Sequence, residues 1–233
     1  LEGEIPEAAQ KGLRESQVLT RHLLACQCQP LAPMQLVLPQ TEGEKRFAQV
    51  VGLRRLNEEI MEVSLAPEGC IDYRAGQFLR LYNPEGEARC YSLASVPALD
   101  PSLVLHVREY PNGLLSSWIH HDLEVGQKVT ISEPTGECCY IPGNPDQPLL
   151  LIGTGSGLAP LYGIARDALE QGHQGTIHLY HGTRTADCLY LEDELHLLMT
   201  VNPHFSYQPC VSGNTASLRP PILAGRASDI AFA

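Results

Sequence analysis

Apolar positions follow two different patterns, which divide the chain into regions. From residue 45 to about 141, short runs that alternate apolar and polar residues are separated by turns rich in Pro and Gly. Such alternation predicts half-buried β-strands. The expected strands are RFAQVVGLRRL, IMEVSLA, QFLRLYN, ARCYSLAS, LVLHVREY and QKVTISEP, a pattern typical of an antiparallel barrel or sandwich.

One helix is expected within this region. The segment Leu114–His121 (LLSSWIHH) follows an Asn-Gly pair and precedes the turn VGQKV. We expect it to cap one end of a barrel, with Trp118 in the core and His120 and His121 at a hydrated surface.

Strands and helices alternate after the Pro- and Gly-rich segment PGNPDQP. The expected strands are LLLIG, TIHLYHG and FSYQPCVS, and the expected helices are 158–170 and 192–199. This alternation predicts a parallel sheet. The final residues, GRASDIAFA, begin an amphipathic helix with no strand after it, so we expect the sheet to lack an edge or central strand.

The first 40 residues contain a candidate polar helix at 7–15 and a candidate strand, MQLVLP. This piece is too small to form a core of its own. The overall expectation is a multi-domain β + α/β chain, in which an antiparallel barrel is followed by a parallel-sheet α/β domain.

Composition and charge narrow the class of protein. A hydrophobic content of 43% over 233 residues supports globular cores. The net charge of −11 is spread along the chain, which disfavours nucleic acid or a membrane as partner. The eight cysteines lack the spacing of a secreted disulfide framework, which favours reduced thiols in the cytoplasm.

A glycine-rich turn carries the clearest chemical signal. The buried strand LLLIG runs into GTGSG, which opens a helix. Backbone N–H groups without neighbouring Cβ atoms at a helix N-terminus bind a pyrophosphate, although the spacing is not the G-x-G-x-x-G of a standard Rossmann turn. The residues of this candidate site are Gly153, Thr154, Gly155, Ser156, Gly157 and Pro160.

Two weaker motifs lie in the barrel region. Arg89, Cys90, Tyr91 and Ser92 form a strand in which an Arg can reach a phosphate and a Tyr can stack on a planar ring. Taken alone, the same residues fit a surface Arg and a half-buried Tyr. The start of the expected capping helix offers a second anion site, or simply an N-terminus capped by a Ser; its residues are Gly113, Leu114, Leu115 and Ser116.

These motifs in order resemble the ferredoxin–NADP reductase superfamily. The order is R-x-Y-S, G-x-x-S, a P-x-G turn at Pro134 and Gly136, and GTGSG with Pro160. The resemblance covers residues 45–233. It implies an FAD-binding barrel at 45–142 and an NAD(P)-binding α/β domain at 147–233.

The resemblance also implies roles for individual residues. Arg89 would hold the flavin pyrophosphate, Tyr91 would stack on the isoalloxazine, and Ser92 would approach flavin N5. His106 and Val107 would line the flavin through their backbone. The phosphates would lie at Gly113 to Ser116, the NAD(P) pyrophosphate at Gly153 to Gly157, and the adenosine ribose at Gly182, Thr183 and Arg184.

The N-terminal segment LLACQ resembles the end of a plant-type [2Fe–2S] ferredoxin domain, which would occupy residues 1–42. Cys26 would then be the last thiolate ligand and Cys28 a bystander, although two buried cysteines near a strand are the alternative. Such clusters also need a C-x₄-C-x₂-C run, which this chain lacks. The Cys-Gly-x-Pro segment usual in this superfamily is also missing after Asp229, so we expect a fragment truncated at both ends, with hydride transfer impaired.

The resemblance thus implies an FAD-dependent NAD(P)H oxidoreductase that passes electrons to an iron–sulfur centre and an acceptor such as an oxygenase. The alternatives are a flavin reductase or electron-transfer subunit of a dehydrogenase, and a nucleotide-binding module without turnover. Arg184 would suit a 2′-phosphate or a surface carboxylate, and NADH is slightly favoured. FAD is favoured over FMN because the ferredoxin-like piece precedes the barrel, an order that resembles the FAD-bearing members of the superfamily.

Overall fold

The computed structural model describes residues 5–233 except 14, 20, 31, 36–44 and 214–217. The chain forms two compact units, Leu1–Gly43 and Glu44–Ala233. None of the helices among the described residues is long and apolar enough to cross a membrane.

The N-terminal unit consists of short helical turns. They are the 3₁₀ helix Glu7–Gln10 (η1), α1 (Glu15–Leu19) and the 3₁₀ helix Ala25–Gln27 (η2). The expected helix at 7–15 is wrong, because Lys11 is extended and Gly12 has a φ of +89°, which ends the helix after one turn. The strand expected at MQLVLP lies for the most part outside the described residues.

The second unit begins with an antiparallel sheet in the order β4-β3-β6-β1-β2-β5. Its strands are β1 (Lys45–Arg55), β2 (Ile60–Pro67), β3 (Phe78–Tyr82), β4 (Ala88–Ser92), β5 (Leu103–Arg108) and β6 (Lys128–Ser132). Leu93, just after β4, forms an antiparallel bridge with Leu105 of β5. This bridge joins the two ends of the sheet, so the expected barrel is confirmed.

The barrel core follows from the alternation of its strands. On β5, Leu103, Leu105 and Val107 point into the barrel and are at most 2% exposed, whereas His106 points to the opposite face. The helix α2 (Leu114–His121) closes the barrel by packing Leu115 into the same core, as the sequence predicted.

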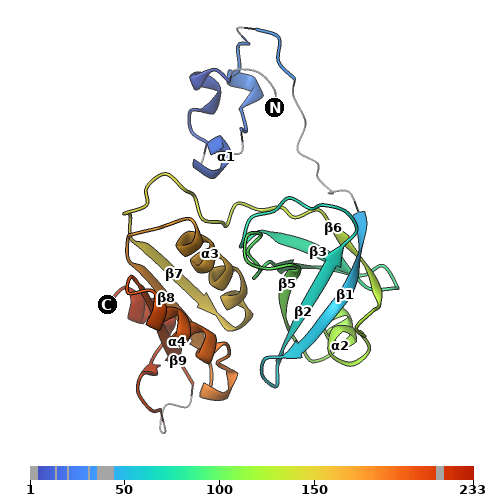
Figure 1. Ribbon diagram of the computed structural model, residues 1–233, viewed down its shortest axis with the longest axis vertical. Coiled ribbons are helices and arrows are strands. Elements are labelled where there is room, and N and C mark those ends of the chain that lie inside the picture. Colours follow the sequence, from blue (N-terminus) through green and yellow to red (C-terminus); the bar gives the residue numbers. More distant parts are fainter. Residues whose placement is uncertain (1–4, 14, 20, 31, 36–44, 214–217) are drawn as a thin grey trace. The chain divides into compact units, whose positions relative to one another are not determined.

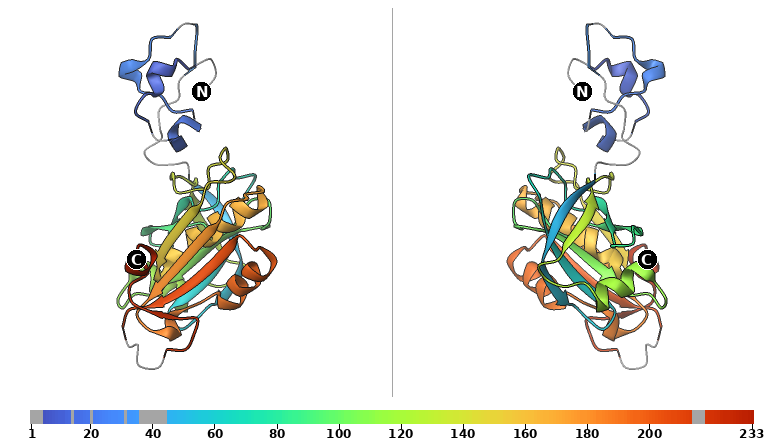
Figure 2. Two further views of the ribbon diagram at one scale, coloured as in Figure 1. Left: turned by 90° about the vertical axis from the view of Figure 1, so that its left-hand side faces the viewer. Right: turned by 90° about the vertical axis from the view of Figure 1, so that its right-hand side faces the viewer.

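A parallel sheet with helices follows, in the order β10-β9-β8-β7; Figures 1 and 2 show β7, β8 and β9 running side by side. Its strands are β7 (Leu149–Thr154), β8 (Ile177–Thr183), β9 (Phe205–Val211) and β10 (Leu223–Ala224), and its helices are α3 (Leu158–Glu170), α4 (Glu192–Val201) and α5 (Ala227–Ala231). The parallel sheet is confirmed, whereas the two-residue β10 was not predicted.

The helix α3 joins the α/β part to the barrel. A Cβ added at Gly163 of α3 would lie 3.0 Å from the carbonyl oxygen of Ala94, which follows β4. Three residues further along α3, Arg166 donates two hydrogen bonds of 2.9 Å to the carboxylate of Asp100. These contacts fix the sheet edge that carries the glycine-rich turn against the barrel.

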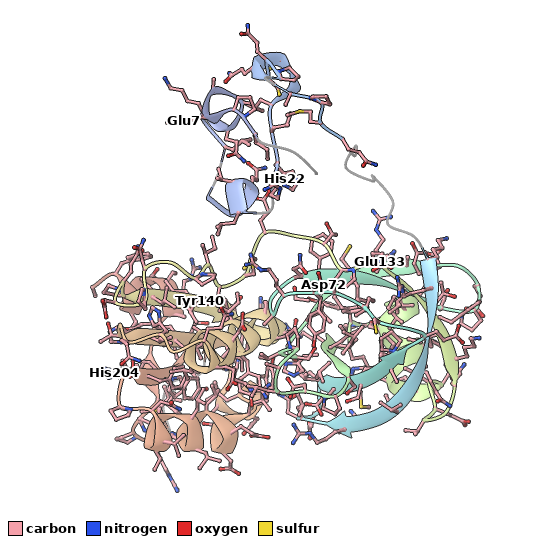
Figure 3. All side chains as sticks on the ribbon, turned by 45° about the horizontal axis from the view of Figure 1, so that its top comes forward. Glu7, His22, Asp72, Glu133, Tyr140 and His204 are labelled. Atoms are coloured by element: carbon pink, nitrogen blue, oxygen red, sulfur yellow. The ribbon has the colours of Figure 1, made fainter. Side chains whose placement is uncertain are left out.

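The segment between β6 and β7 has irregular backbone around its two cysteines. Cys138 and Cys139 lie in irregular backbone and not in a strand, since the short bridge of Thr135 to Phe78 is not continued. Tyr140, labelled in Figure 3, belongs to this segment, and its hydroxyl meets Nδ1 of His173 at 3.1 Å. This contact ties the segment to the loop after α3.

Candidate functional site

Two cavities lie in the second unit, and they share part of their walls. We name them the barrel cavity, of about 410 Å³, and the loop cavity, of about 600 Å³. Both volumes are in the range of small-molecule sites. The barrel cavity is lined by Arg89, Cys90, Tyr91, His106, Arg108, Tyr110, Gly113, Leu114, Leu115, Ser116 and Ser156.

The strand β4 brings three of the expected residues to the barrel cavity. Tyr91 is half-buried and packs against the barrel core, and burial raises the pKa of its phenol to about 12. Arg89 is exposed, and its guanidinium donates a 2.7 Å hydrogen bond to the Ala88 carbonyl. Ser92, the last residue of β4, is not among the lining residues.

The start of α2 supplies the opposite wall, where the sequence placed Gly113, Leu114, Leu115 and Ser116. The Ser116 hydroxyl accepts the N–H of Tyr110 at 3.2 Å and lies 3.4 Å from the Gly113 carbonyl oxygen. It therefore fixes the loop that leads into the helix, whose first turn has N–H groups without intrahelical partners.

His106 and Val107 differ in their relation to the barrel cavity. His106 contributes to the wall of the barrel cavity with its side chain only 1% exposed, so its backbone is the part within reach of a ligand. Val107 is not a lining residue, and its carbonyl accepts a 2.9 Å hydrogen bond from Nε2 of His120. The expected hydrated position of His120 is wrong because that ring is buried beneath β5; His121 is exposed.

The loop cavity collects the glycine-rich turn and the end of β8. Six of the expected residues line it: Thr154, Gly155, Ser156, Gly182, Thr183 and Arg184. Gly155 has a φ of +52°, a left-handed conformation that suits Gly.

Gly153, Gly157 and Pro160 do not line the loop cavity. At Gly153, an added Cβ would approach the Gly157 carbonyl oxygen at 2.9 Å. This Gly therefore serves the close packing of strand against helix, which is one of the roles expected in such turns.

Sequence reasoning missed a set of residues at the junction of the cavities. Arg108, at the end of β5, and Tyr110 line both cavities, as does Ser156, which the sequence predicted. The Arg108 guanidinium lies 2.7 Å from the Glu59 carboxylate and 5.6 Å from the centre of the Tyr110 ring. The sequence shows only an Arg before a turn, which is too common a feature to single out. The other missed residues of the loop cavity are Glu59, Ile60, Ile152, Thr185, Cys188, Ser212, Gly225, Arg226, Ala227 and Ser228.

A buried polar cluster crosses from the barrel to the α/β part. Nδ1 of His106 meets the Tyr190 hydroxyl at 3.3 Å, and the Tyr190 ring packs edge-on against His181 of β8 at 5.3 Å. Burial lowers the pKa of His106 to about 3 and that of His181 to about 4. Both imidazoles are therefore neutral at neutral pH.

The predicted cluster ligand lies in the N-terminal unit. Cys26 is exposed on η2, and Cys28 has its sulfur 3.9 Å from the sulfur of Met34. Within the part of the chain that the structure describes, no group of His, Cys, Asp and Glu side chains is arranged to hold a metal. The described residues thus do not form an iron–sulfur site by themselves.

Models of two protein domains match the second unit. An oxidoreductase FAD-binding domain matches residues 55–140, which include the walls of the barrel cavity from Arg89 to Ser116. An oxidoreductase NAD-binding domain matches residues 151–219, which include the glycine-rich turn and the end of β8. The chain therefore has FAD and NAD(P)H as its cofactors.

Similar proteins are reductases. The reductase subunit of an aromatic O-demethylase from Amycolatopsis sp. is 34% identical, over 81% of this chain and 60% of that protein. The reductase component of a propane 2-monooxygenase from Gordonia sp. is 31% identical, over 78% of this chain and 54% of that protein. This chain thus spans less than two thirds of the length of either relative.

The match to one solved structure covers a larger share of the other chain. The crystal structure of the cytochrome P450 reductase GcoB from Amycolatopsis is 30% identical, with a TM-score of 0.74, and the match covers 99% of this chain and 72% of that one. The chain belongs to the ferredoxin–NADP reductase family of FAD- and NAD-binding oxidoreductases.

Proposed function

We propose that the protein takes electrons from NAD(P)H onto FAD and passes them to an iron–sulfur centre and an acceptor of the oxygenase type. One observation carries this proposal: the barrel cavity and the loop cavity share Arg108, Tyr110 and Ser156. Ligands in the two cavities would therefore meet at a common wall, as hydride transfer between two rings requires.

The barrel cavity fits a flavin. When bound, FAD accepts a hydride and releases electrons singly. Tyr91 offers a half-buried ring for stacking on a planar group, while Arg89 and the first turn of α2 offer positive charge and N–H groups for phosphates. Ser92 does not line the cavity, so we assign it a supporting place at the end of β4.

The loop cavity fits a nicotinamide dinucleotide. A Cβ added at Gly157 would meet nothing within 4 Å, and one at Gly155 would meet only Arg108 at 3.6 Å. The turn is therefore open to close approach by a pyrophosphate. Gly182, Thr183 and Arg184, which follow on the neighbouring strand, would face the adenosine ribose.

The acceptor is proposed from the relatives and not from a site in this chain. The relatives are named as reductase components of a monooxygenase and an O-demethylase. Cys26 is kept as a candidate ligand to an iron–sulfur centre, and residues 1–42 as the end of a ferredoxin-like domain. We derive no step through a cluster, since the described residues do not hold one.

The test is the redox behaviour of the purified protein with FAD. We expect flavin absorbance to remain after gel filtration, to bleach under anaerobic NADH or NADPH, and to return when a one-electron acceptor such as ferricyanide is added. Comparison of NADH with NADPH gives the nucleotide preference. A colourless protein that still binds the nucleotide would contradict the proposal and identify a binding module.

A further inference from the structure

His181 is a buried residue of β8 directly behind the glycine-rich turn. Its side chain is fully buried, and it is not a lining residue of either cavity. Nε2 lies 3.2 Å from the carbonyl oxygen of Gly155, and Nδ1 lies 3.4 Å from the hydroxyl of Tyr207. The ring thus contacts the turn from beneath and cannot touch a ligand in the loop cavity.

These contacts determine which ring nitrogen of His181 carries the proton. A carbonyl oxygen only accepts hydrogen bonds, so Nε2 must be the donor to Gly155. A neutral imidazole has one N–H, and Nδ1 must then accept the hydroxyl proton of Tyr207. Because burial keeps the pKa of His181 at about 4, the ring is neutral at neutral pH, and the two contacts select this tautomer.

The bond to Gly155 also orients the next peptide unit. The Gly155 carbonyl accepts a second hydrogen bond from the N–H of Leu158, at the start of α3. In a planar trans peptide the C=O and N–H groups point in opposite directions. With the carbonyl held toward β8 and α3, the N–H of Ser156 points away from both, and Ser156 lines both cavities.

We propose that His181 is a positioning residue, which holds the Gly155–Ser156 peptide so that the N–H of Ser156 faces the dinucleotide pyrophosphate. The inference rests on the proposed function, because it requires NAD(P)H in the loop cavity. It assigns a task to a buried imidazole that the proposed redox chemistry does not otherwise use.

The test compares two substitutions and two probes. His181→Leu removes the donor, whereas His181→Gln places an amide N–H near the position of Nε2. The probes are ADP-ribose, which carries a pyrophosphate, and adenosine, which does not, and their binding is measured by calorimetry. We expect H181L to weaken ADP-ribose binding about tenfold, as for a lost hydrogen bond to a charged group, to leave adenosine binding unchanged, and H181Q to restore most of the loss.

A purely structural role would give a different result. If H181L binds ADP-ribose as the wild type does, or loses both probes equally, the inference is overturned while the proposed function stands. If the wild-type protein binds neither ADP-ribose nor NAD(P)H, the proposed function fails and the inference fails with it. FAD content and thermal midpoint, measured for each variant, identify a general loss of folding.

A second measurement reads the tautomer of His181 directly in the wild-type protein. Nitrogen NMR of the wild-type protein labelled in its histidines distinguishes a protonated from an unprotonated ring nitrogen. We expect His181, assigned by its loss in H181Q, to carry its proton on Nε2 both with and without ADP-ribose. A proton on Nδ1 would overturn the inference, because the bond to Gly155 could not then exist.

Discussion

At the scale of single residues, Tyr91 and Arg108 are placed for contact with a ligand by different means. Tyr91 owes its position to β4, which packs the side chain against the core while leaving it among the lining residues of the barrel cavity. Arg108 owes its position to partners, namely the Glu59 carboxylate and the Tyr110 ring. A substitution at Tyr91 therefore changes the stacking surface of the barrel cavity, whereas one at Arg108 changes the charge of the cavity wall.

We expect Tyr91→Ala to weaken FAD binding about tenfold or more, because the ring's stacking, roughly 1 kcal/mol, is lost together with the apolar area that it would bury. Tyr91→Phe keeps the ring and serves as the matched control, with near wild-type affinity. Fluorescence titration of the FAD-free protein measures both constants. Equal affinities for Y91A and the wild type would exclude stacking by this ring.

Substitutions at Arg108 and Glu59 should change the affinity for NAD(P)H in opposite directions. A dinucleotide pyrophosphate is anionic, so Arg108→Gln removes an attractive charge from the wall of the loop cavity and should weaken NAD(P)H binding several-fold. Glu59→Gln removes a repulsive charge and frees the guanidinium, so it should strengthen binding. Titration at low and high salt measures both, since screening reduces each effect. Weaker binding in E59Q would show that the ion pair itself shapes the cavity.

The sequence predicted which residues line the cavities better where the backbone decides their position than where side-chain direction does. Gly155 and Ser156 follow from the sequence because a buried strand that leads into a glycine-rich helix start is typical of a pyrophosphate site. Arg108 was missed because its relation to both cavities requires β5 to end beside the glycine-rich turn. His120 was misplaced because nothing in the sequence shows that its ring lies beneath β5.

At the scale of elements, α3 connects the barrel with the α/β part through contacts that include the approach of Gly163 to Ala94 and one ion pair. Arg166 of α3 and Asp100, from the segment between β4 and β5, have side chains that are each 19% exposed. The Asp100 carboxylate also accepts the N–H of Val96 at 2.7 Å. The pair therefore stabilises both the α3 contact and the turn that receives it.

We expect Arg166→Met and Asp100→Asn each to lower the free energy of unfolding by about 1–3 kcal/mol, because each leaves a partly buried charged group without its partner. The double variant should lose less than the sum of the two, with a coupling energy of about 1 kcal/mol or more. Urea unfolding of the wild type, the two single variants and the double variant measures this coupling energy. Strictly additive losses would show that the two side chains do not stabilise each other.

Elements with a strong period were predicted to their ends, and short ones were not. α2 and α3 begin and end where the sequence placed them, since an amphipathic pattern and a preceding Gly define each. The helix expected at 7–15 is wrong because a polar composition does not compensate for Gly12, whose φ of +89° ends the helix. β10 has two residues, and a strand of that length leaves no pattern to recognise.

At the scale of the whole molecule, two buried histidines make the stability of the fold depend on pH. His106 belongs to the barrel and His181 to the parallel sheet, and Tyr190 contacts both rings. Burial lowers their pKa values from the ordinary 6.5 to about 3 and about 4. Between these values and 6.5 the unfolded chain binds protons that the folded protein excludes.

The sign of the effect follows from this difference in bound protons. Because the unfolded state binds more protons in that range, stability rises with pH there and levels off above about pH 7, where both states hold neutral imidazoles. Each histidine contributes a slope of about 1.4 kcal/mol per pH unit once its unfolded form is protonated. Lowering the pH from 6.5 toward 4 should therefore destabilise the protein steadily.

Carboxylates also titrate in this range, so the prediction is made for a difference between two proteins. The double variant H106Q/H181Q keeps polar side chains at both positions but cannot take up a proton there. We expect urea unfolding to give a flatter dependence on pH for this variant than for the wild type between pH 6.5 and 4, with the two curves parallel above about pH 7. If the curves stay parallel throughout, the two imidazoles titrate alike in the folded and unfolded chains, and the buried cluster that joins barrel and sheet is not closed to protons.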